Sequence, residues 1–263
     1  MPERSADPAT SHPQPAPPAR LAQAAIAAAL AVAAAVLGPF LARSGLVPSS
    51  LGEGIFRAAV PLALAAVVLA ILAVRRSRRR FGGLVVIGVA VAAAALPIRI
   101  WVAARSAPPI HDVTTDLDNP PRYVAVARLR VPPANSIDYG GEPVATQQRA
   151  SYADLRPLIV HAAPPRVLAM AADTARAEGW TVLAQDIGFG DLGRLEATDT
   201  SFLFARLDDV VVRIVPHPAG SRVDVRSSAR EGGADEGRNA RRVRRFLAFL
   251  AERAAAEPGG AAR

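Results

Sequence analysis

Apolar residues dominate the first third of the chain, in three uncharged runs at Leu21–Ala42, Ala58–Val74 and Phe81–Ile98. A helix needs about 20 apolar residues to cross the hydrocarbon core of a bilayer, and these runs are close to that length. A cleaved signal peptide is the rival interpretation of the first run, but the run is long and lacks the basic region that opens such peptides. The pattern therefore predicts three transmembrane helices within residues 21–105.

The arginines between the runs predict the orientation of the helices. Five of the six residues in Arg75–Arg80 are arginine, whereas the loop between the first two runs contains only Arg43 and Arg57. Because positively charged loops stay in the cytoplasm, the second loop is expected inside. Residues 1–20, rich in proline, alanine and serine, then form a disordered cytoplasmic tail. The third helix carries the rest of the chain outside, which is the periplasm in a Gram-negative cell.

Residues 107–256 show the patterns of a soluble domain. Proline and glycine pairs interrupt residues 106–155, so this stretch is expected to wrap around the domain in extended form, with one strand at Tyr123–Val131. Apolar stripes with suitable ends predict two helices, Pro164–Gly179 and Asp235–Ala256. Alternating or β-branched segments predict further strands, at Pro157–His161, Trp180–Ile187, Arg194–Thr200, Ser201–Arg206, Val210–Val215 and Arg222–Ser227.

This order of elements predicts an α+β fold. Three N-terminal transmembrane helices are followed by a soluble domain with an antiparallel sheet and two packed helices, and we expect these two helices to cover one face of the sheet. Residues 257–263 are expected to form a second disordered tail.

Composition and charge exclude several kinds of site. The chain has no cysteine, so disulfides, thiolate metal sites and cysteine nucleophiles are ruled out. The net charge of +8 belongs mainly to the membrane region, because residues 1–104 hold 10 arginines and 3 acidic residues, a balance of +7. Residues 105–263 hold 21 arginines and 20 acidic residues, a balance of +1. A nucleic-acid-binding domain carries the positive field itself, so nucleic acid is not an expected partner.

Two short motifs have both a functional and a structural interpretation. Gly188–Gly193 matches the dinucleotide fingerprint G-x-G-x-x-G, but the residues after it resemble a strand and not the helix that holds a pyrophosphate. We therefore favour a glycine-rich turn between antiparallel strands. The second motif is a cluster of potential Ca²⁺ ligands, His111, Asp112, Asp116, Asp118 and Asn119. EF-hand spacing is absent there, so a polar loop is favoured, and we predict no metal and no cofactor.

Catalytic residues do not stand out. Asp208 and Asp209 form a carboxylate pair that, together with Glu196 and a histidine, supports the alternative hypothesis of a hydrolase-like enzyme. Adjacent acids before a strand more often form a tight, solvated hairpin turn. We therefore predict no catalytic residue and lean away from an enzyme. The chain has no Gly-x-Ser-x-Gly nucleophile elbow, and no two of its four histidines share metal-ligand spacing: His12, His111, His161 and His217.

The most distinctive polar block runs from Ser221 to Phe246. A predicted strand, a glycine-containing loop and the start of the last helix bring several arginines close to a helix N-terminus. Guanidinium groups in such a place suit a phosphate, a carboxylate or a lipid headgroup. The structural alternative is a solvated face with salt bridges, in which an acid caps the helix. The predicted ligand-binding residues are Arg226, Arg230, Asp235, Asn239 and Arg242.

Four blocks between Pro109 and Leu250 resemble the domain-of-unknown-function 1499 family. They are Ile110–Asp116 with Asp118–Pro121, Tyr139–Glu142 with Gln147–Arg149 and Tyr152, Arg194–Thr198 with Asp208–Arg213, and Ser221–Ser227 with Arg230, Gly232, Asp235, Gly237, Asn239 and Arg242. The resemblance implies a bacterial envelope domain that is sometimes fused to membrane helices. It supports a domain boundary near residue 107 and implies no activity.

These patterns lead to one main hypothesis and two alternatives. We expect a multi-pass protein of the bacterial inner membrane, with its N-terminus in the cytoplasm and its C-terminal domain in the periplasm. The leading hypothesis is a non-enzymatic envelope protein whose exported domain binds an anionic ligand, a lipid headgroup or a protein partner, with the lipid bilayer as its other partner. The alternatives are a hydrolase-like enzyme that uses the carboxylate pair and a structural brace of a membrane complex.

Overall fold

The computed structural model describes residues 19–76, 80–131, 134–188 and 192–256. The chain divides into two compact units, of which the first is helical and contains residues up to 41 together with residues 51–98. The second unit contains residues 42–50 and the chain from residue 99 onward. The predicted tails at residues 1–20 and 257–263 lie outside the described residues, except for Ala19 and Arg20, which begin the first helix.

Three long helices contain the apolar runs of the sequence. They are α1 (Ala19–Arg43), α2 (Ser49–Arg76) and α3 (Arg80–Arg105). All three are long and apolar enough to cross a membrane, so the predicted set of three such helices is confirmed.

The helices of the first unit pack through small residues. A Cβ at Gly38 of α1 would lie 2.5 Å from the carbonyl oxygen of Gly52 in α2, so the two backbones approach closely there. Large side chains such as Ile26, Leu64 and Leu84 point outward and are more than half exposed. Small residues inside and large apolar residues outside are the arrangement expected of helices in lipid. One buried cluster of this unit consists of Ala28, Ala31, Ala63, Ala66, Ala90 and Ala94.

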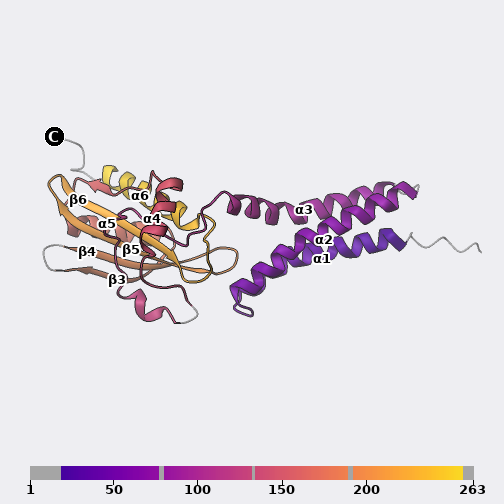
Figure 1. Cartoon of the computed structure of the whole chain (residues 1–263), viewed down its shortest axis with the longest axis horizontal. Helices are drawn as coiled ribbons and strands as arrows, with labels where there is room; N and C mark the ends of the chain where they lie inside the picture. Colours follow the sequence, from indigo (N-terminus) through magenta and orange to yellow (C-terminus); the bar gives the residue numbers. More distant parts are fainter. Residues whose placement is uncertain (1–18, 77–79, 132–133, 189–191, 257–263) are drawn as a thin grey trace, which may run out of the picture. The chain divides into compact units, whose positions relative to one another are not determined.

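The second unit is built on a six-stranded antiparallel sheet (Figure 1). Its strands follow the order β1-β6-β5-β4-β3, and β2 also pairs with β6, beyond the residues of β6 that pair with β1. Long pairings join β4, β5 and β6, so these three strands form the centre of the sheet. The strands are β1 (Asp112–Thr114), β2 (Leu158–Val160), β3 (Thr181–Ile187), β4 (Gly193–Thr200), β5 (Leu207–His217) and β6 (Gly220–Ala229).

Helices α5 (Pro164–Ala177) and α6 (Arg238–Ala256) cover one face of this sheet. The ring of Phe246 in α6 stacks on Trp180 with the centroids 5.0 Å apart, and both side chains are buried. Their neighbours are the inward-facing residues of the central strands, among them Val210, Val212, Val223 and Val225. The predicted α+β fold, with an antiparallel sheet and helices packed against it, is thereby confirmed.

Local sequence signals explain where several elements begin and end. Pro164 begins α5, where a missing N–H costs nothing, and Gly179 follows that helix with a φ of +80°. Gly220 has a φ of +127° in the tight β5–β6 turn, and a Cβ there would lie 2.3 Å from the carbonyl oxygen of Val160. Only glycine fits that position without strain.

Three local predictions differ from the structure. Tyr123–Val131 is not a strand but contains the short 3-10 helix η1 (Val126–Leu129). Ser201–Arg206 is the turn between β4 and β5, so the strand that pairs with β4 begins only at Leu207. The stretch expected to be irregular contains α4 (Gly141–Ser151), where the Gln148 side chain bonds both the N–H and the carbonyl of Thr114 in β1. An amide side chain thus continues the hydrogen bonding beyond this short edge strand.

The Trp180–Phe246 stack yields a test of the domain core. Phe246→Ala removes a fully buried ring and is expected to cost about 3–5 kcal/mol of unfolding free energy. Phe249→Ala changes a ring on the same helix that is 44% exposed, so its effect is expected to be within about 1 kcal/mol. Thermal unfolding of the two full-length variants in detergent measures the difference. Equal melting temperatures would contradict the described packing.

Candidate functional site

The face of the sheet opposite α5 and α6 is strongly charged. Because side chains alternate along a strand, the residues between the core positions of β4, β5 and β6 all point to this second face. Residues 116–131 and 134–138, called the covering segment below, cross it, and Tyr123 and Val126 of this segment pack on Val211 of β5. The polar side chains beneath the segment are Glu196, Thr198, Asp209, Arg213, Asp224, Arg226 and Ser228.

Arg226 lies at the centre of this face and is almost completely buried. Its Nε lies 3.0 Å from Oδ1 of Asp112, and its Nη2 lies 2.6 Å from Oδ2. The same guanidinium donates to the carbonyl oxygens of Pro121 at 3.2 Å and Ile137 at 2.9 Å. It therefore joins β1, β6 and two distant points of the covering segment. Four of its five N–H groups are engaged by these acceptors.

Two tyrosine rings enclose the guanidinium of Arg226. Its central carbon lies 4.7 Å from the ring centroid of Tyr123 and 5.6 Å from that of Tyr139, within the range of cation–π attraction. Burial raises the pKa of the Asp112 carboxyl, and the hydrogen bonds from Arg226 oppose this shift. Burial also raises the pKa of Tyr139 to about 12, so its hydroxyl is a proton donor at neutral pH.

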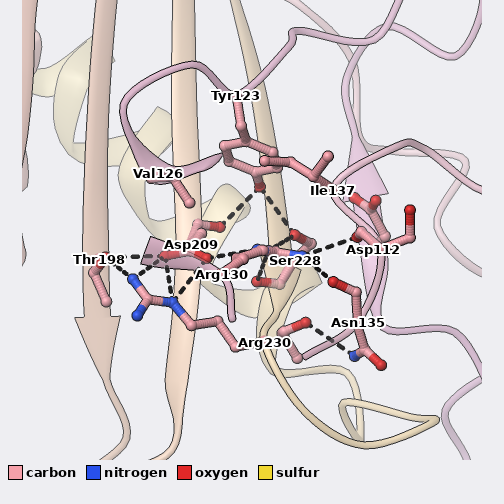
Figure 2. A network of polar contacts seen from close by, with 12 residues as sticks. Asp112, Tyr123, Val126, Arg130, Asn135, Ile137, Thr198, Asp209, Ser228 and Arg230 are labelled. Carbon is pink, nitrogen blue, oxygen red and sulfur yellow. Dashed lines mark hydrogen bonds and ion pairs between the residues drawn. The ribbon is translucent and has the colours of Figure 1, made fainter. Parts of the chain in front are cut away.

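A second buried carboxylate, Asp209, forms ion pairs with two arginines (Figure 2). Arg230 binds it bidentately, through Nη2 to Oδ1 at 2.8 Å and through Nε at 3.0 Å. Arg130 of the covering segment donates from Nε to Oδ2 at 2.9 Å, and the Thr198 hydroxyl donates to Oδ1 at 2.9 Å. Charge-assisted bonds of this kind are roughly twice as strong as neutral ones. Asp209 therefore anchors the segment to the centre of the sheet.

Charged side chains also satisfy the backbone of the covering segment. The Glu196 carboxylate accepts the N–H groups of Val124 and Val126, both at 2.9 Å. Arg130 donates to the carbonyl oxygen of Ser136 at 2.9 Å. Buried backbone groups need such partners wherever helix and sheet bonds are missing. The network thus replaces regular secondary structure along this segment.

The structure divides the five predicted ligand-binding residues between the two faces of the sheet. Arg226 and Arg230 belong to the charged face just described, where each has a carboxylate partner. Asp235, Asn239 and Arg242 lie at the start of α6, on the helix-covered face. The prediction that these five residues bind a ligand stays a prediction.

The three residues near α6 have structural roles there. Asp235 accepts the backbone N–H of Asn239 at 2.7 Å and so caps the helix, as the structural alternative anticipated. The Asn239 side chain accepts the hydroxyl of Ser227 at 2.8 Å. Arg242 pairs with Asp208 at 2.6 Å and with Asp199 at 2.7 Å.

The carboxylate pair of the enzyme hypothesis does not converge. Asp208 and Asp209 are consecutive residues within β5, so they point to opposite faces of the sheet, and both are fully buried. The predicted solvated turn at this position is therefore wrong. Three of the four histidines fall among the described residues, at separate places: His111 before β1, His161 after β2 and His217 at the end of β5. Within the same described ranges, no group of three histidine or carboxylate side chains is arranged to hold a metal ion.

The glycine-rich motif at Gly188–Gly193 and the cluster of potential Ca²⁺ ligands near β1 also have structural explanations. Gly188 directly follows β3 and Gly193 begins the antiparallel strand β4, so a strand follows the motif where a nucleotide site requires a helix. Residues 189–191 of this motif lie outside the described residues. In the polar cluster, Asp112 pairs with Arg226, and Asp116 pairs with Arg213 at 2.7 Å. These acids therefore bind arginines of the sheet.

An open pocket of about 430 Å³ lies beside Arg226. Acidic, basic and aromatic side chains share its wall, and the Tyr139 hydroxyl is buried without a hydrogen-bond partner among the described residues. Arg226 is the one predicted site residue that contributes to this wall. The other residues that give the pocket its chemistry are Asp118, Asn119, Arg122, Tyr123, Asp138 and Tyr139.

Sequence reasoning missed most residues of this charged face. Tyr123 and Arg130 lie in a stretch that was predicted to be a strand and Tyr139 in one predicted to be irregular, so the sequence has no signal for their positions over the sheet. One signal was present, namely the alternation of arginine and aspartate along β6. Valines at the intervening positions mark the buried face, so this alternation assigns Arg222, Asp224 and Arg226 to the opposite face.

Comparison with known proteins gives one match. The family model described as "Protein of unknown function (DUF1499)" matches residues 112–250, which is more than half of the chain. No curated protein and no solved structure matches the chain. The matched range begins with β1 and ends within α6, so it contains the sheet, the covering segment and the pocket.

Asp209 provides the test of the charged network. Asp209→Asn leaves Arg130 and Arg230 buried without their counter-charge, which is expected to cost about 3–5 kcal/mol of unfolding free energy. The matched control is Asp173→Asn, because Asp173 forms a surface ion pair with Arg176 in which both side chains are more than half exposed. Thermal unfolding of both full-length variants measures the two effects. Equal stability of the two variants would contradict the anchoring role of Asp209.

Proposed function

This chain belongs to the DUF1499 family of proteins of unknown function, and we propose that it is a membrane-anchored binding protein of the bacterial envelope. In this proposal, α1, α2 and α3 hold the chain in the inner membrane, and the C-terminal domain binds a polar headgroup in the pocket beside Arg226. The observation that carries the proposal is the pocket wall itself, in which charges of both signs and two tyrosine rings surround about 430 Å³.

The chemistry of this wall favours a small zwitterion with a phosphate and an amine. Arg122 is an exposed arginine on the wall and supplies a cation for the phosphate. Asp118 and Asp138 are exposed carboxylates that suit the amine. The rings of Tyr123 and Tyr139 provide rigid apolar surface between the charges. Phosphoethanolamine, the headgroup of a common bacterial phospholipid class, has this combination of groups.

Arg226 has a different role in this proposal from the one expected of it. Asp112 already neutralises the charge of Arg226. We therefore assign Arg226 a structural role, in which its hydrogen bonds to the carbonyl oxygens of Pro121 and Ile137 hold the pocket wall in place. An incoming anion is therefore expected to meet Arg122 first. Arg230 and Arg242 are each paired to buried carboxylates and lie away from the pocket wall.

The orientation of the chain is part of the same proposal. The arginine-rich loop at Arg75–Arg80 favours the cytoplasm, which directs the end of α3 and the domain after it to the periplasm. A fusion of alkaline phosphatase after Arg263 is expected to be active, because this enzyme needs an oxidising compartment. The same reporter fused after Arg76 is expected to be inactive. An inactive fusion after Arg263 together with an active fusion after Arg76 would contradict the proposed orientation.

Ligand binding is tested by thermal unfolding of the full-length protein in detergent. Phosphoethanolamine at a hundredfold excess over its Kd is expected to stabilise the domain by about 2.7 kcal/mol, or roughly 5–10 °C in Tm. Inorganic phosphate and ethanolamine, tested separately, are expected to give smaller shifts, because each fills only half of the pocket. Arg122→Ala is expected to abolish the shift without changing the Tm of the free protein.

The matched control for that variant is Arg128→Ala. Arg128 is an exposed arginine of η1 in the same covering segment, and it does not line the pocket. Its replacement is expected to leave the response to phosphoethanolamine intact. A flat response of the unaltered protein to all three probes would refute the pocket proposal and favour the structural brace. An equal loss in both variants would show a non-specific charge effect and would count against it too.

A further inference from the structure

The turn between β4 and β5 has hydrogen bonds across its base and an exposed aromatic side chain, Phe202, at its tip. Ser201 and Arg206 are joined twice, since the Ser201 N–H donates to the Arg206 carbonyl at 2.8 Å and the Ser201 hydroxyl accepts the Arg206 N–H at 2.9 Å. Ala205 adopts a φ of +51° and donates to the Ser201 carbonyl at 3.1 Å. Phe204 folds inward and is 7% exposed, whereas Phe202 is 79% exposed. The tip therefore carries one largely exposed aromatic ring, and the Arg43 guanidinium lies 5.3 Å from the centroid of that ring.

Phe202 is unusual within its own unit. Among the described residues of the C-terminal unit from Arg99 onward, it is the most exposed large apolar side chain. A single exposed apolar residue is common on protein surfaces and has no meaning by itself. The exposure of Phe202 matters because its turn lies close to the point where the chain enters the domain.

The turn lies at the end of the sheet where the chain arrives from α3. The His111 carbonyl, just before β1, accepts the N–H of Ala229 at 2.8 Å. Ala229 is the register partner of Asp208 in β5, and the N–H of the next residue, Arg230, donates to Leu207 at 3.0 Å. Leu207 directly follows the turn. The entry of the chain and the base of the turn are thus connected by consecutive hydrogen bonds.

The covalent chain limits how far this end of the domain can be from the end of α3. Residues 106–111 separate α3 from β1, and fully extended they reach about 20 Å. The β5–β6 turn at His217–Gly220 lies at the opposite end of the sheet, about 30 Å away along β6. The end that carries Phe202 is therefore the tethered end.

We propose that Phe202 inserts into the interfacial layer of the same bilayer that α3 crosses. Aromatic rings are favoured in this layer, and hydrogen bonds among Ser201, Ala205 and Arg206 fix the base of the turn that carries Phe202. The contact gives the domain a second attachment besides the linker and restricts its orientation. It uses a surface separate from the pocket, so it stands or falls independently of headgroup binding.

Labelling of single cysteines tests this contact, because the chain has no native cysteine. Phe202→Cys and Phe249→Cys each carry an NBD fluorophore, and the full-length proteins are placed in nanodiscs of phosphatidylethanolamine and phosphatidylglycerol. Phe249 is the matched control, being an exposed phenylalanine on the outer side of α6. The label at residue 202 is expected to emit further to the blue. Nitroxide lipids are expected to quench it several-fold more than the control label, and aqueous iodide several-fold less.

Two outcomes overturn the proposal. In the first, iodide quenches both labels equally and the nitroxide lipids quench neither, which means that Phe202 faces water. In the second, the label at residue 202 is shielded from iodide and from nitroxide lipids alike, which means that protein covers it. A circular-dichroism melt of each labelled protein confirms that both variants are folded, so either result is informative.

Discussion

The pairing of buried arginines with buried carboxylates under the covering segment, residues 116–131 and 134–138, is the interaction on which the rest of the domain depends. Among its described residues this segment has one short 3-10 helix, η1, and most of the backbone groups described there have no helix or sheet partner. Glu196 and Arg226 of the sheet supply those partners, and Arg130 of the segment reaches back to Asp209. Removing charges from water is costly, and the cost is recovered only where nearly every donor and acceptor is used. That condition explains why each of these side chains has several partners.

Because buried arginines need carboxylate partners, an arginine-rich sequence block can indicate internal ion pairs and not a binding site. A bidentate guanidinium recognises a free anion and an internal carboxylate with the same geometry, so the residue type alone does not distinguish a binding site from a structural pair. In this domain Asp112, Asp208 and Asp209 occupy the positions that a bound anion would take on Arg226, Arg242 and Arg230. An external anion would have to displace a carboxylate that is covalently part of the fold. In the proposed function, recognition of an anion therefore depends on side chains at the edge of the network, such as Arg122.

The sequence predicted the elements whose apolar pattern is local, and it failed where the deciding partner is distant. Three helices long and apolar enough to span a membrane, the long strands and α5 and α6 followed from runs and periodicity. The apolar run Ser201–Arg206 resembles a strand, but the φ of Ala205 reverses the chain there. Helix α4 has no apolar stripe, and Gln148 attaches it to β1 through polar bonds.

The acidic pair at Asp208 and Asp209 shows the same limitation. Two adjacent acids indicate a solvated turn unless arginines elsewhere in the fold neutralise them, and Arg242 and Arg230 do so from 34 and 21 residues away. The candidate site shares this dependence. Arg226 was identified from the sequence, but Tyr123 and Tyr139 reach its guanidinium only through the path of the covering segment.

The distribution of charge limits how the domain could meet the headgroup of the proposed function. Residues 1–104 hold a balance of +7 and the remaining residues hold +1, so the domain has no strong field to attract an anion through solution. Attachment to α3 by six residues compensates for this, because a tethered domain meets the lipids around it at a high effective concentration. A weak pocket then becomes sufficient, and contact of Phe202 with the bilayer would narrow the orientations in which the domain meets those headgroups. In these proposals, proximity to the bilayer takes the place of long-range electrostatic attraction.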